Sequence, residues 1–241
     1  MNEQRFTVSG VEFEYAFDRY DLVSSKDRIV LLKPKYVVDR YVEMLAGRRA
    51  PNILDLGIFE GGSAILLALL IPDAKIVGID SDQRIHTDAV VRELGLSDRI
   101  KFHHRTLQQD AVALPPILEQ EFGDKPIDMV IDDASHLLGP SRDSFELLWP
   151  YLAPGGRYVI EDWNWAHYPG VYQTEKWMDQ PALTNLVFEL VMAIGSDYRF
   201  ASRMVIESIS ASIEKVGPYD PKNRLDLSKV IVSRGRLPTQ I

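Results

Sequence analysis

Cysteine is absent from the 241-residue sequence. Its absence excludes disulfide frameworks, thiolate metal ligands and cysteine nucleophiles. Long apolar runs are also missing, since the longest covers residues 64–71 and a membrane-spanning helix needs about 20 apolar residues. The opening residues, MNEQRFTVSG, contain no apolar segment typical of a secretory signal. We therefore expect a cytoplasmic protein without a membrane partner.

Basic residues are fewer than acidic residues. The sequence has 27 Lys and Arg against 35 Asp and Glu, a net charge of −8, and no tract in which basic residues gather. Because proteins bind nucleic acid by neutralising phosphates with basic side chains, we expect no nucleic-acid partner. The remaining composition, 46% hydrophobic and 26% charged, is that of a globular protein with a full core.

A rhythm of strand followed by helix begins at about residue 51. Short apolar runs rich in Ile and Val, separated by helical patterns, occupy residues 52–56, 75–80, 100–104, 128–133 and 157–162. This alternation predicts an α/β fold with a doubly wound, mostly parallel, Rossmann-like sheet. Two closing segments, 204–216 and 229–233, alternate well enough to predict a C-terminal antiparallel hairpin. We expect about seven strands in all.

The first fifty residues have a different character. Pro34 suits the first position of a helix, the apolar residues that follow have helical spacing, and Gly47 suits its end. We therefore predict two domains, an N-terminal helical appendage or lid over residues 1–50 and the main domain over residues 51–241.

A turn that contains glycines, residues 57–63, joins the first predicted strand, residues 52–56, to an apolar helix. Small residues there allow the backbone to approach a ligand, and the amides at the start of the helix favour an anionic group. The dinucleotide fingerprint G-x-G-x-x-G fails, because Phe59 stands where a glycine is required. An NAD-type oxidoreductase is therefore an alternative that this turn disfavours.

The polar residues around that turn favour S-adenosylmethionine as the cofactor. Asp80, at the end of the second strand, offers a carboxylate to both hydroxyls of a ribose, and Asp55 suits a cationic amino acid group. The predicted cofactor contacts are Asp55, Gly57, Glu60, Gly61, Ser63, Asp80, Ser81, Thr106 and Asp132. In the alternative interpretation, the turn only packs helix on sheet and Asp80 caps a helix.

Acidic residues also follow the fourth and fifth strands. Asp133, Glu161 and Asp162 would repel one another at adjacent strand ends unless a cation lay among them. Hard oxygen ligands without cysteine suit Mg²⁺ or a similar divalent ion. We therefore predict a metal site whose ion lowers the pKa of an acceptor hydroxyl.

His136 follows Asp133 by three residues in the loop after the strand. Imidazole titrates near neutral pH, so His136 is the predicted general base, with Asp133 as the second catalytic residue. The alternative is a loop histidine that caps the next helix. A non-catalytic module that kept the fold also remains open.

Three segments carry a resemblance to a known family. Residues 53–63 (ILDLGIFEGGS), 130–136 (VIDDASH) and 144–162 (SFELLWPYLAPGGRYVIED) resemble the macrocin and mycinamicin group of metal-dependent sugar O-methyltransferases. The resemblance implies a class I S-adenosylmethionine-dependent enzyme. It assigns Mg²⁺ to Asp133, Glu161 and Asp162, and makes His136 the base. It also implies methylation of a deoxysugar hydroxyl on a glycosylated natural product, as in antibiotic biosynthesis.

Aromatic residues gather directly after the predicted metal ligands, where three of the four tryptophans, Trp163, Trp165 and Trp177, lie close together in the sequence. Flat apolar faces with polar edges suit stacking on a sugar. The predicted acceptor contacts are Trp163, Trp165, His167 and Tyr168. Packing of a long loop or of a subunit interface is the alternative. A catechol or other phenol is the alternative acceptor, and the sequence does not distinguish a monomer from a homo-oligomer.

Overall fold

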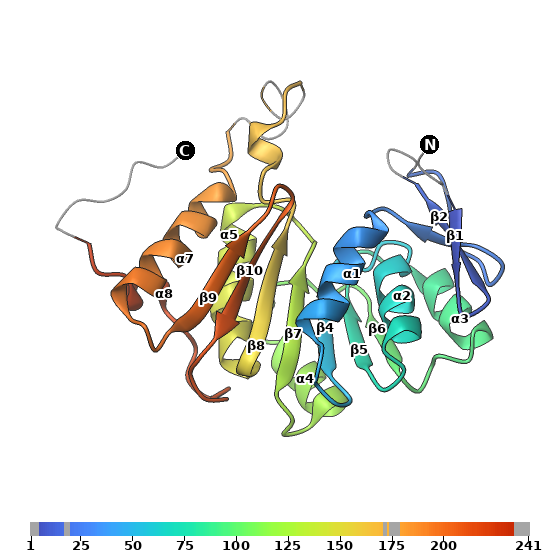
Figure 1. Ribbon diagram of the computed structural model, residues 1–241, viewed down its shortest axis with the longest axis horizontal. Coiled ribbons are helices and arrows are strands. Elements are labelled where there is room, and N and C mark those ends of the chain that lie inside the picture. The colour runs from blue at the N-terminus through green and yellow to red at the C-terminus, as the bar shows by residue number, and fades with distance from the viewer. Residues whose placement is uncertain (1–4, 17–19, 171–172, 174–178, 234–241) are drawn as a thin grey trace. The chain divides into compact units, whose positions relative to one another are not determined.

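The computed structural model describes residues 5–16, 20–170, 173 and 179–233 (Figure 1). The chain divides into two compact units, residues 1–107 (unit 1) and residues 108–241 (unit 2). Trp177 of the aromatic segment lies outside the described residues.

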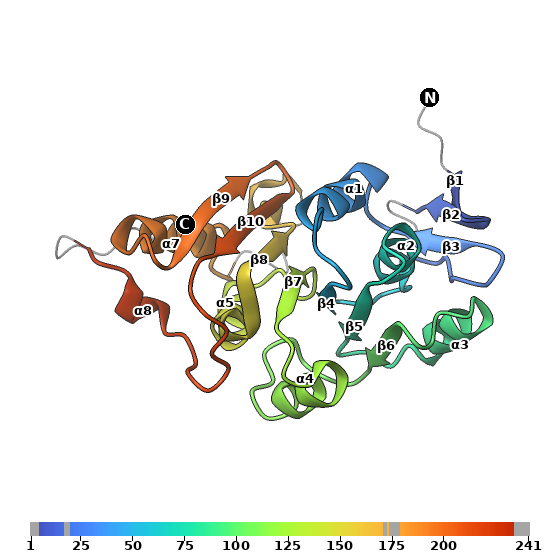
Figure 2. The same ribbon diagram turned by 60° about the horizontal axis from the view of Figure 1, so that its bottom comes forward.

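Unit 1 begins with a three-stranded sheet in the order β1-β2-β3 (Figure 2). Its strands are β1 (Arg5–Val8), β2 (Val11–Tyr15) and β3 (Ile29–Leu31). Helix α1 (Lys35–Met44) follows directly after Pro34, where the sequence predicts a helix. The prediction of a helical N-terminal segment is therefore wrong for these three strands, because the short alternating runs of β1 and β2 pair as a hairpin and β3 pairs with β2. A role for residues 1–50 as a lid stays a prediction.

The rest of unit 1 alternates strands and helices as predicted. The elements are β4 (Asn52–Leu56), α2 (Gly62–Leu70), β5 (Lys75–Ile79), α3 (Ile85–Glu93) and β6 (Ile100–His103). The three strands are parallel. Helix α2 is apolar along most of its length and packs against α1 and β3, so it is a core helix. No helix in the described part of the chain is long and apolar enough to cross a membrane.

Unit 2 contains the remaining elements. They are α4 (Leu114–Phe122), β7 (Ile127–Asp132), α5 (Leu138–Leu148), η1 (Trp149–Tyr151), β8 (Leu152–Glu161), η2 (Trp165–His167), α7 (Thr184–Ser196), β9 (Ala201–Ile206), β10 (Ser210–Lys215) and α8 (Leu227–Val230). Strands β7 and β8 are parallel, and β10 runs antiparallel to both β8 and β9. Helix α7 contacts α5, α8 and β9.

The hydrogen-bonded order of the seven-stranded sheet is β6-β5-β4-β7-β8-β10-β9. The predicted α/β class, the mostly parallel sheet and the C-terminal antiparallel hairpin are confirmed. The predicted strands of that hairpin are wrong. Residues 204–216 turn back within the run, where Glu207 N donates to Ser210 O, so that β9 and β10 both lie between residues 201 and 215. Lys229 instead lies in α8, which Asp226 caps by accepting from Ser228 N.

Aromatic side chains fill the space between α5 and the sheet of unit 2. The ring of Phe145 lies 4.9 Å from that of Trp149 and 4.9 Å from that of Tyr158. Phe200 adds a fourth ring 4.9 Å from Trp149. Because aromatic pairs at these distances contribute beyond their buried area, the cluster holds β8 firmly against α5.

A buried lysine fixes the antiparallel edge of unit 2. Lys215, at the end of β10, is 4% exposed. Its ammonium donates to the carbonyl oxygens of Pro150 at 3.1 Å and Leu152 at 2.9 Å. Burial lowers the pKa of Lys215 to about 8. The side chain therefore satisfies two carbonyls at the start of β8 at the cost of holding a charge away from water.

This lowered pKa predicts a pH-dependent contribution to stability. Between pH 8 and about 10 the unfolded chain binds more protons at Lys215 than the folded chain, so stability rises with pH. We expect the free energy of unfolding of the wild type, relative to Lys215→Met, to increase by about 2 kcal/mol from pH 8 to 10. Urea denaturation of both proteins across this range measures the difference. A difference that is independent of pH would contradict the assignment.

Candidate metal centre and cofactor turn

The glycine-containing turn of unit 1 follows β4 as predicted. Gly57 and Gly61 have φ angles of 95° and 76°, which side chains other than glycine rarely adopt. Asp55 is 1% exposed and accepts a hydrogen bond from Ser63 Oγ at 3.0 Å. The predicted contacts Asp55, Gly57, Gly61 and Ser63 therefore lie on one local turn between β4 and α2.

Asp80 closes this turn. Its Oδ2 accepts from the backbone amides of Ile58 and Phe59, both at 3.0 Å, and its Oδ1 accepts from Asp82 N at 2.8 Å. Since each carboxylate oxygen has two lone pairs, Oδ1 of Asp80 can accept one further hydrogen bond, as from a ribose hydroxyl. In the structure, Asp80 stabilises the turn by accepting hydrogen bonds from its backbone amides. The neighbouring Ser81 is exposed.

Glu60 anchors the N-terminal segment to the same turn. Its carboxylate is 4% exposed, accepts from Ser24 N at 2.7 Å, and lies 2.9 Å from His86 Nε2. In return, Ser24 Oγ donates to the carbonyl oxygen of Glu60 at 2.9 Å. The sequence predicts a cofactor contact for Glu60, whereas the structure shows a buried internal partner. Nothing in the local sequence pointed to Ser24, which lies 36 positions away.

Close packing at the start of α2 explains why residue 62 is a glycine. A Cβ atom at this position would lie 2.2 Å from the carbonyl oxygen of Val30, which a side chain cannot accommodate. Strand β3 therefore lies directly against the start of α2, and the N-terminal segment is built into the surroundings of the turn.

Thr106, near the end of unit 1, is hydrogen-bonded to the backbone of neighbouring residues. It is 7% exposed, its hydroxyl donates to His104 O at 3.2 Å, and its amide donates to Asp80 O at 2.9 Å. A cofactor contact through Thr106 stays a prediction.

In unit 2, Asp132 is a buried support beneath the loop that follows β7. It is 2% exposed and accepts from Tyr158 OH at 2.9 Å and from Gln108 Nε2 at 2.8 Å. Burial raises the pKa of Asp132 to about 7, and the charge of Asp133 adds to the rise. The sequence predicts a cofactor contact for Asp132 and gives no signal for Gln108, whose importance depends on two contacts that are distant in sequence.

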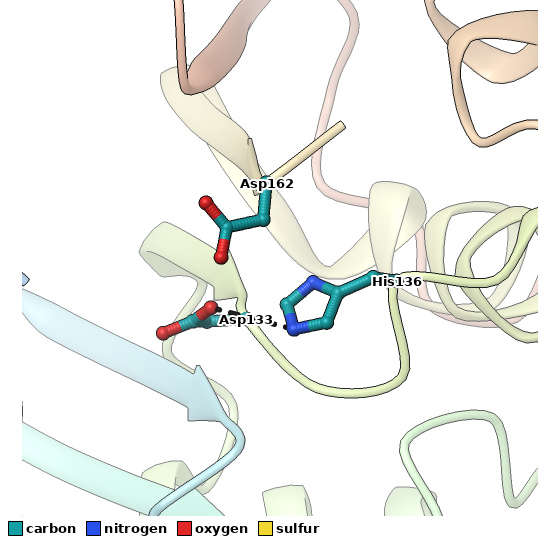
Figure 3. Close-up of side chains that lie close together, drawn as sticks. All are labelled: Asp133, His136 and Asp162. Carbon is teal, nitrogen blue, oxygen red and sulfur yellow. Dashed lines mark ion pairs between the residues drawn. The ribbon is translucent and has the colours of Figure 1, made fainter. Parts of the chain in front are cut away.

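Three side chains from the ends of β7 and β8 converge in unit 2. One ligand atom from each of Asp133, His136 and Asp162 lies within 4.8 Å of the others. Figure 3 shows the two carboxylates and the imidazole turned toward one another, with His136 Nε2 3.9 Å from Asp133 Oδ1. This convergence of the predicted base with two predicted metal ligands defines the candidate metal centre.

Strained backbone accompanies this cluster. His136 and Asp162 have φ angles of 55° and 53°, in the left-handed region that is uncommon outside glycine. Residues held in this region cost of order 1–3 kcal/mol and gather at functional sites. The strain at two of the three clustered residues supports a functional interpretation of the cluster.

Glu161 lies outside the cluster that the structure assembles among its described residues. It is the last residue of β8, is 4% exposed, and pairs in register with Ser210 of β10. Adjacent residues of a strand point to opposite faces, and the chain turns at Asp162, so the two carboxylates leave the strand in different directions. Glu161 as a metal ligand therefore stays a prediction.

A pocket opens beside the candidate metal centre. Its lining consists of His136, Leu137, Asp162, Trp163, Trp165, Ala166, Gln180, Pro181, Ala182 and Leu183. The ring of Trp165 lies 4.1 Å from the imidazole of His136. Two of the predicted acceptor residues, Trp163 and Trp165, thus line a cavity that contains the predicted base.

The other predicted acceptor residues have different surroundings. His167 Nε2 lies 2.6 Å from Thr184 Oγ1, and Tyr168 is 37% exposed with its hydroxyl 3.1 Å from Asn164 Nδ2. Neither is among the residues that line the pocket. Trp163 also donates through Nε1 to Glu207 O at 3.0 Å, which fixes the ring at one edge.

The fold and the candidate site can be compared with protein families. A protein-family model described as a methyltransferase domain matches residues 54–163. Residues 54–163 are therefore similar to a methyltransferase domain.

Two curated relatives that match the chain are named as O-methyltransferases. Demethylmacrocin O-methyltransferase of Streptomyces fradiae is 53% identical over 126 residues, and mycinamicin VI 2''-O-methyltransferase of Micromonospora griseorubida is 35% identical over 129 residues. Each alignment covers 49% of this chain and 29% of the relative. The resemblance predicted from the sequence is confirmed, although the match spans under a third of these relatives.

A solved structure is also similar. MycE methyltransferase of the mycinamycin biosynthetic pathway, in complex with Mg, S-adenosylhomocysteine and mycinamycin VI, matches with a TM-score of 0.59 and 27% identity. The match covers 85% of this chain and 51% of that chain.

The buried position of Glu60 generates a prediction. Glu60→Ala leaves the amide of Ser24 without its acceptor, so we expect the free energy of unfolding to fall by about 1–3 kcal/mol. Urea denaturation measures the loss. The matched control is Glu43→Ala, because Glu43 is 67% exposed in a surface ion pair and surface pairs contribute about 0–1 kcal/mol. If Glu60→Ala were as stable as the wild type but bound S-adenosylhomocysteine more weakly, Glu60 would act as a cofactor contact and not as a structural support.

Proposed function

We propose that this protein transfers a methyl group from S-adenosylmethionine to a sugar hydroxyl of a glycosylated natural product, with Mg²⁺ bound in unit 2. The observation that carries the proposal is the convergence of Asp133, His136 and Asp162 in a chain that carries a methyltransferase domain. The sugar O-methyltransferases among its relatives support the acceptor class.

The residues of the cluster fit a divalent cation. Mg²⁺ binds oxygen ligands at about 2.0–2.1 Å, and the three side chains already lie within 4.8 Å of one another. Asp133 and Asp162 supply hard oxygen donors of the kind that this ion prefers. Glu161 is the third proposed ligand, adjacent to Asp162 in the chain. When bound, the ion supplies Lewis acidity that lowers the pKa of a coordinated hydroxyl.

The turn of unit 1 fits the cofactor. The buried Asp55 carboxylate suits the cationic amino group of S-adenosylmethionine, and Asp80 offers acceptor capacity to the ribose. Both carboxylates are held in place by hydrogen bonds within the turn. A site ordered in this way before binding loses less conformational entropy when the cofactor arrives.

His136 is the proposed general base. Its ring is held against Trp165 and beside Asp133, with a side chain that is 10% exposed. It takes the proton from the acceptor hydroxyl as the oxygen bonds to the methyl carbon. In the same step the carbon–sulfur bond would break, and the sulfur would keep the bonding electron pair as S-adenosylhomocysteine leaves.

The pocket beside His136 is the proposed acceptor site. Trp163 and Trp165 line it with aromatic surface, which stacks on the apolar face of a sugar ring. His167 and Tyr168 do not line this pocket and stay in the proposal as predicted acceptor contacts. A catechol is the second candidate acceptor, because two adjacent phenolic oxygens also bind a divalent ion.

An acceptor screen tests the function. Purified protein with S-adenosylmethionine and Mg²⁺ is offered glycosylated macrolides, simple catechols and free deoxysugars, and methylated products are measured by mass spectrometry. We expect turnover of glycosides that chelator abolishes. Asp133→Ala should lose this turnover but keep S-adenosylhomocysteine affinity, whereas Asp143→Asn, at an exposed position, should behave as wild type. Turnover of catechols alone would reject the sugar, and full activity in chelator would reject the metal.

His136→Ala tests the base. We expect kcat to fall by about 10²–10⁴ with little change in cofactor affinity, because a positioned general base typically contributes this much. Mn²⁺ affinity, measured on the same variant, separates two roles of the imidazole. A base leaves that affinity nearly unchanged, whereas loss of Mn²⁺ binding would make His136 a ligand. A kcat within about twofold of wild type would remove it from the mechanism.

A further inference from the structure

We infer that Gln108 is a positioning residue that fixes the loop carrying Asp133 and His136. Gln108 is 6% exposed and bridges two points of this loop. Its Nε2 donates to Asp132 Oδ1 at 2.8 Å, and its Oε1 accepts from Ser135 N at 2.9 Å. The two contacts lie on either side of Asp133, and the second is at the residue immediately before His136.

An amide side chain is suited to this bridge. It offers a donor and an acceptor from one rigid plane, whereas a carboxylate only accepts and an ammonium only donates. The second oxygen of Asp132 accepts from Tyr158 OH at 2.9 Å. Asp132 is therefore held at both oxygens, which fixes the direction in which the chain leaves β7 immediately before Asp133.

The other end of the bridge holds the strained part of the loop. His136 has a φ of 55°, and such a conformation persists when surrounding contacts determine it. Ser135 N donates to Gln108, and Ser135 Oγ accepts from Leu137 N at 3.3 Å, so residues on both sides of His136 are bonded. With this loop fixed, the imidazole and the Asp133 carboxylate face Asp162 (Figure 3).

This inference rests on the metal site of the proposed function, but Gln108 is no metal ligand itself. A partner that orients the first ligands of a metal typically changes metal affinity by 10–100-fold. A glutamine that only stabilised the core would lower the melting temperature and leave metal affinity unchanged below it. Direct metal binding therefore distinguishes positioning from general stability.

The test uses the whole 241-residue chain and Mn²⁺ as the probe. Gln108→Met keeps the length of the side chain and removes both hydrogen bonds. Gln108→Asn keeps the amide on a shorter stem that cannot span both partners. Gln109→Met is the matched control at the next position, which is half-buried. Free Mn²⁺ is measured by electron paramagnetic resonance in the absence of acceptor, well below the melting temperature of each variant.

We expect at least a tenfold loss of Mn²⁺ affinity in both Gln108 variants and less than a twofold change in Gln109→Met. A loss below tenfold in both Gln108 variants, with normal binding by the wild type, overturns the inference and leaves the metal site standing. If Gln108→Met does not fold, the Mn²⁺ affinity of Gln108→Asn alone tests the inference. Absence of Mn²⁺ binding by the wild type overturns this inference together with the proposed metal site.

Discussion

Negative charge gathered at the ends of β7 and β8 is the constraint on which the candidate site of unit 2 depends. Asp132 is buried and its charge is supported by Tyr158 and Gln108, which donate to it. Asp133 and Asp162 instead face one another beside an imidazole, and Asp133 is 24% exposed. Two carboxylates that face one another in this way repel each other, and a cation between them would offset the repulsion. The fold thus separates one carboxylate that organises the loop from two that are available to a metal ion.

Acidic residues also support the backbone around the turn of unit 1. Asp80 binds backbone amides of the turn, and Glu60 binds the amide of Ser24, so both carboxylates shape the site from within. Buried acceptors of this kind are costly to leave unpaired, which makes the local geometry rigid. Both units therefore use acidic residues as supports for the backbone.

Local patterns predicted most of the fold. The apolar runs at 52–56 and 75–80 became β4 and β5 almost without change, because strands buried on both faces need continuous apolar sequence. The closing hairpin was misplaced, since alternation continues through the turn after Glu207 and hides the break. The N-terminal sheet was missed because β1 and β2 are short and their partner β3 is separated from them by many residues.

The sequence by itself determined the chemical groups of the site, since Asp133, His136 and Asp162 follow strands whose ends must meet at one edge of a parallel sheet. Tertiary structure decided what each group does. Glu60 became a support through a partner 36 positions away, and Asp132 through Tyr158, 26 positions away. Burial and hydrogen bonding depend on such distant contacts, and no local pattern of residues encodes which carboxylate will be enclosed and which will face a ligand.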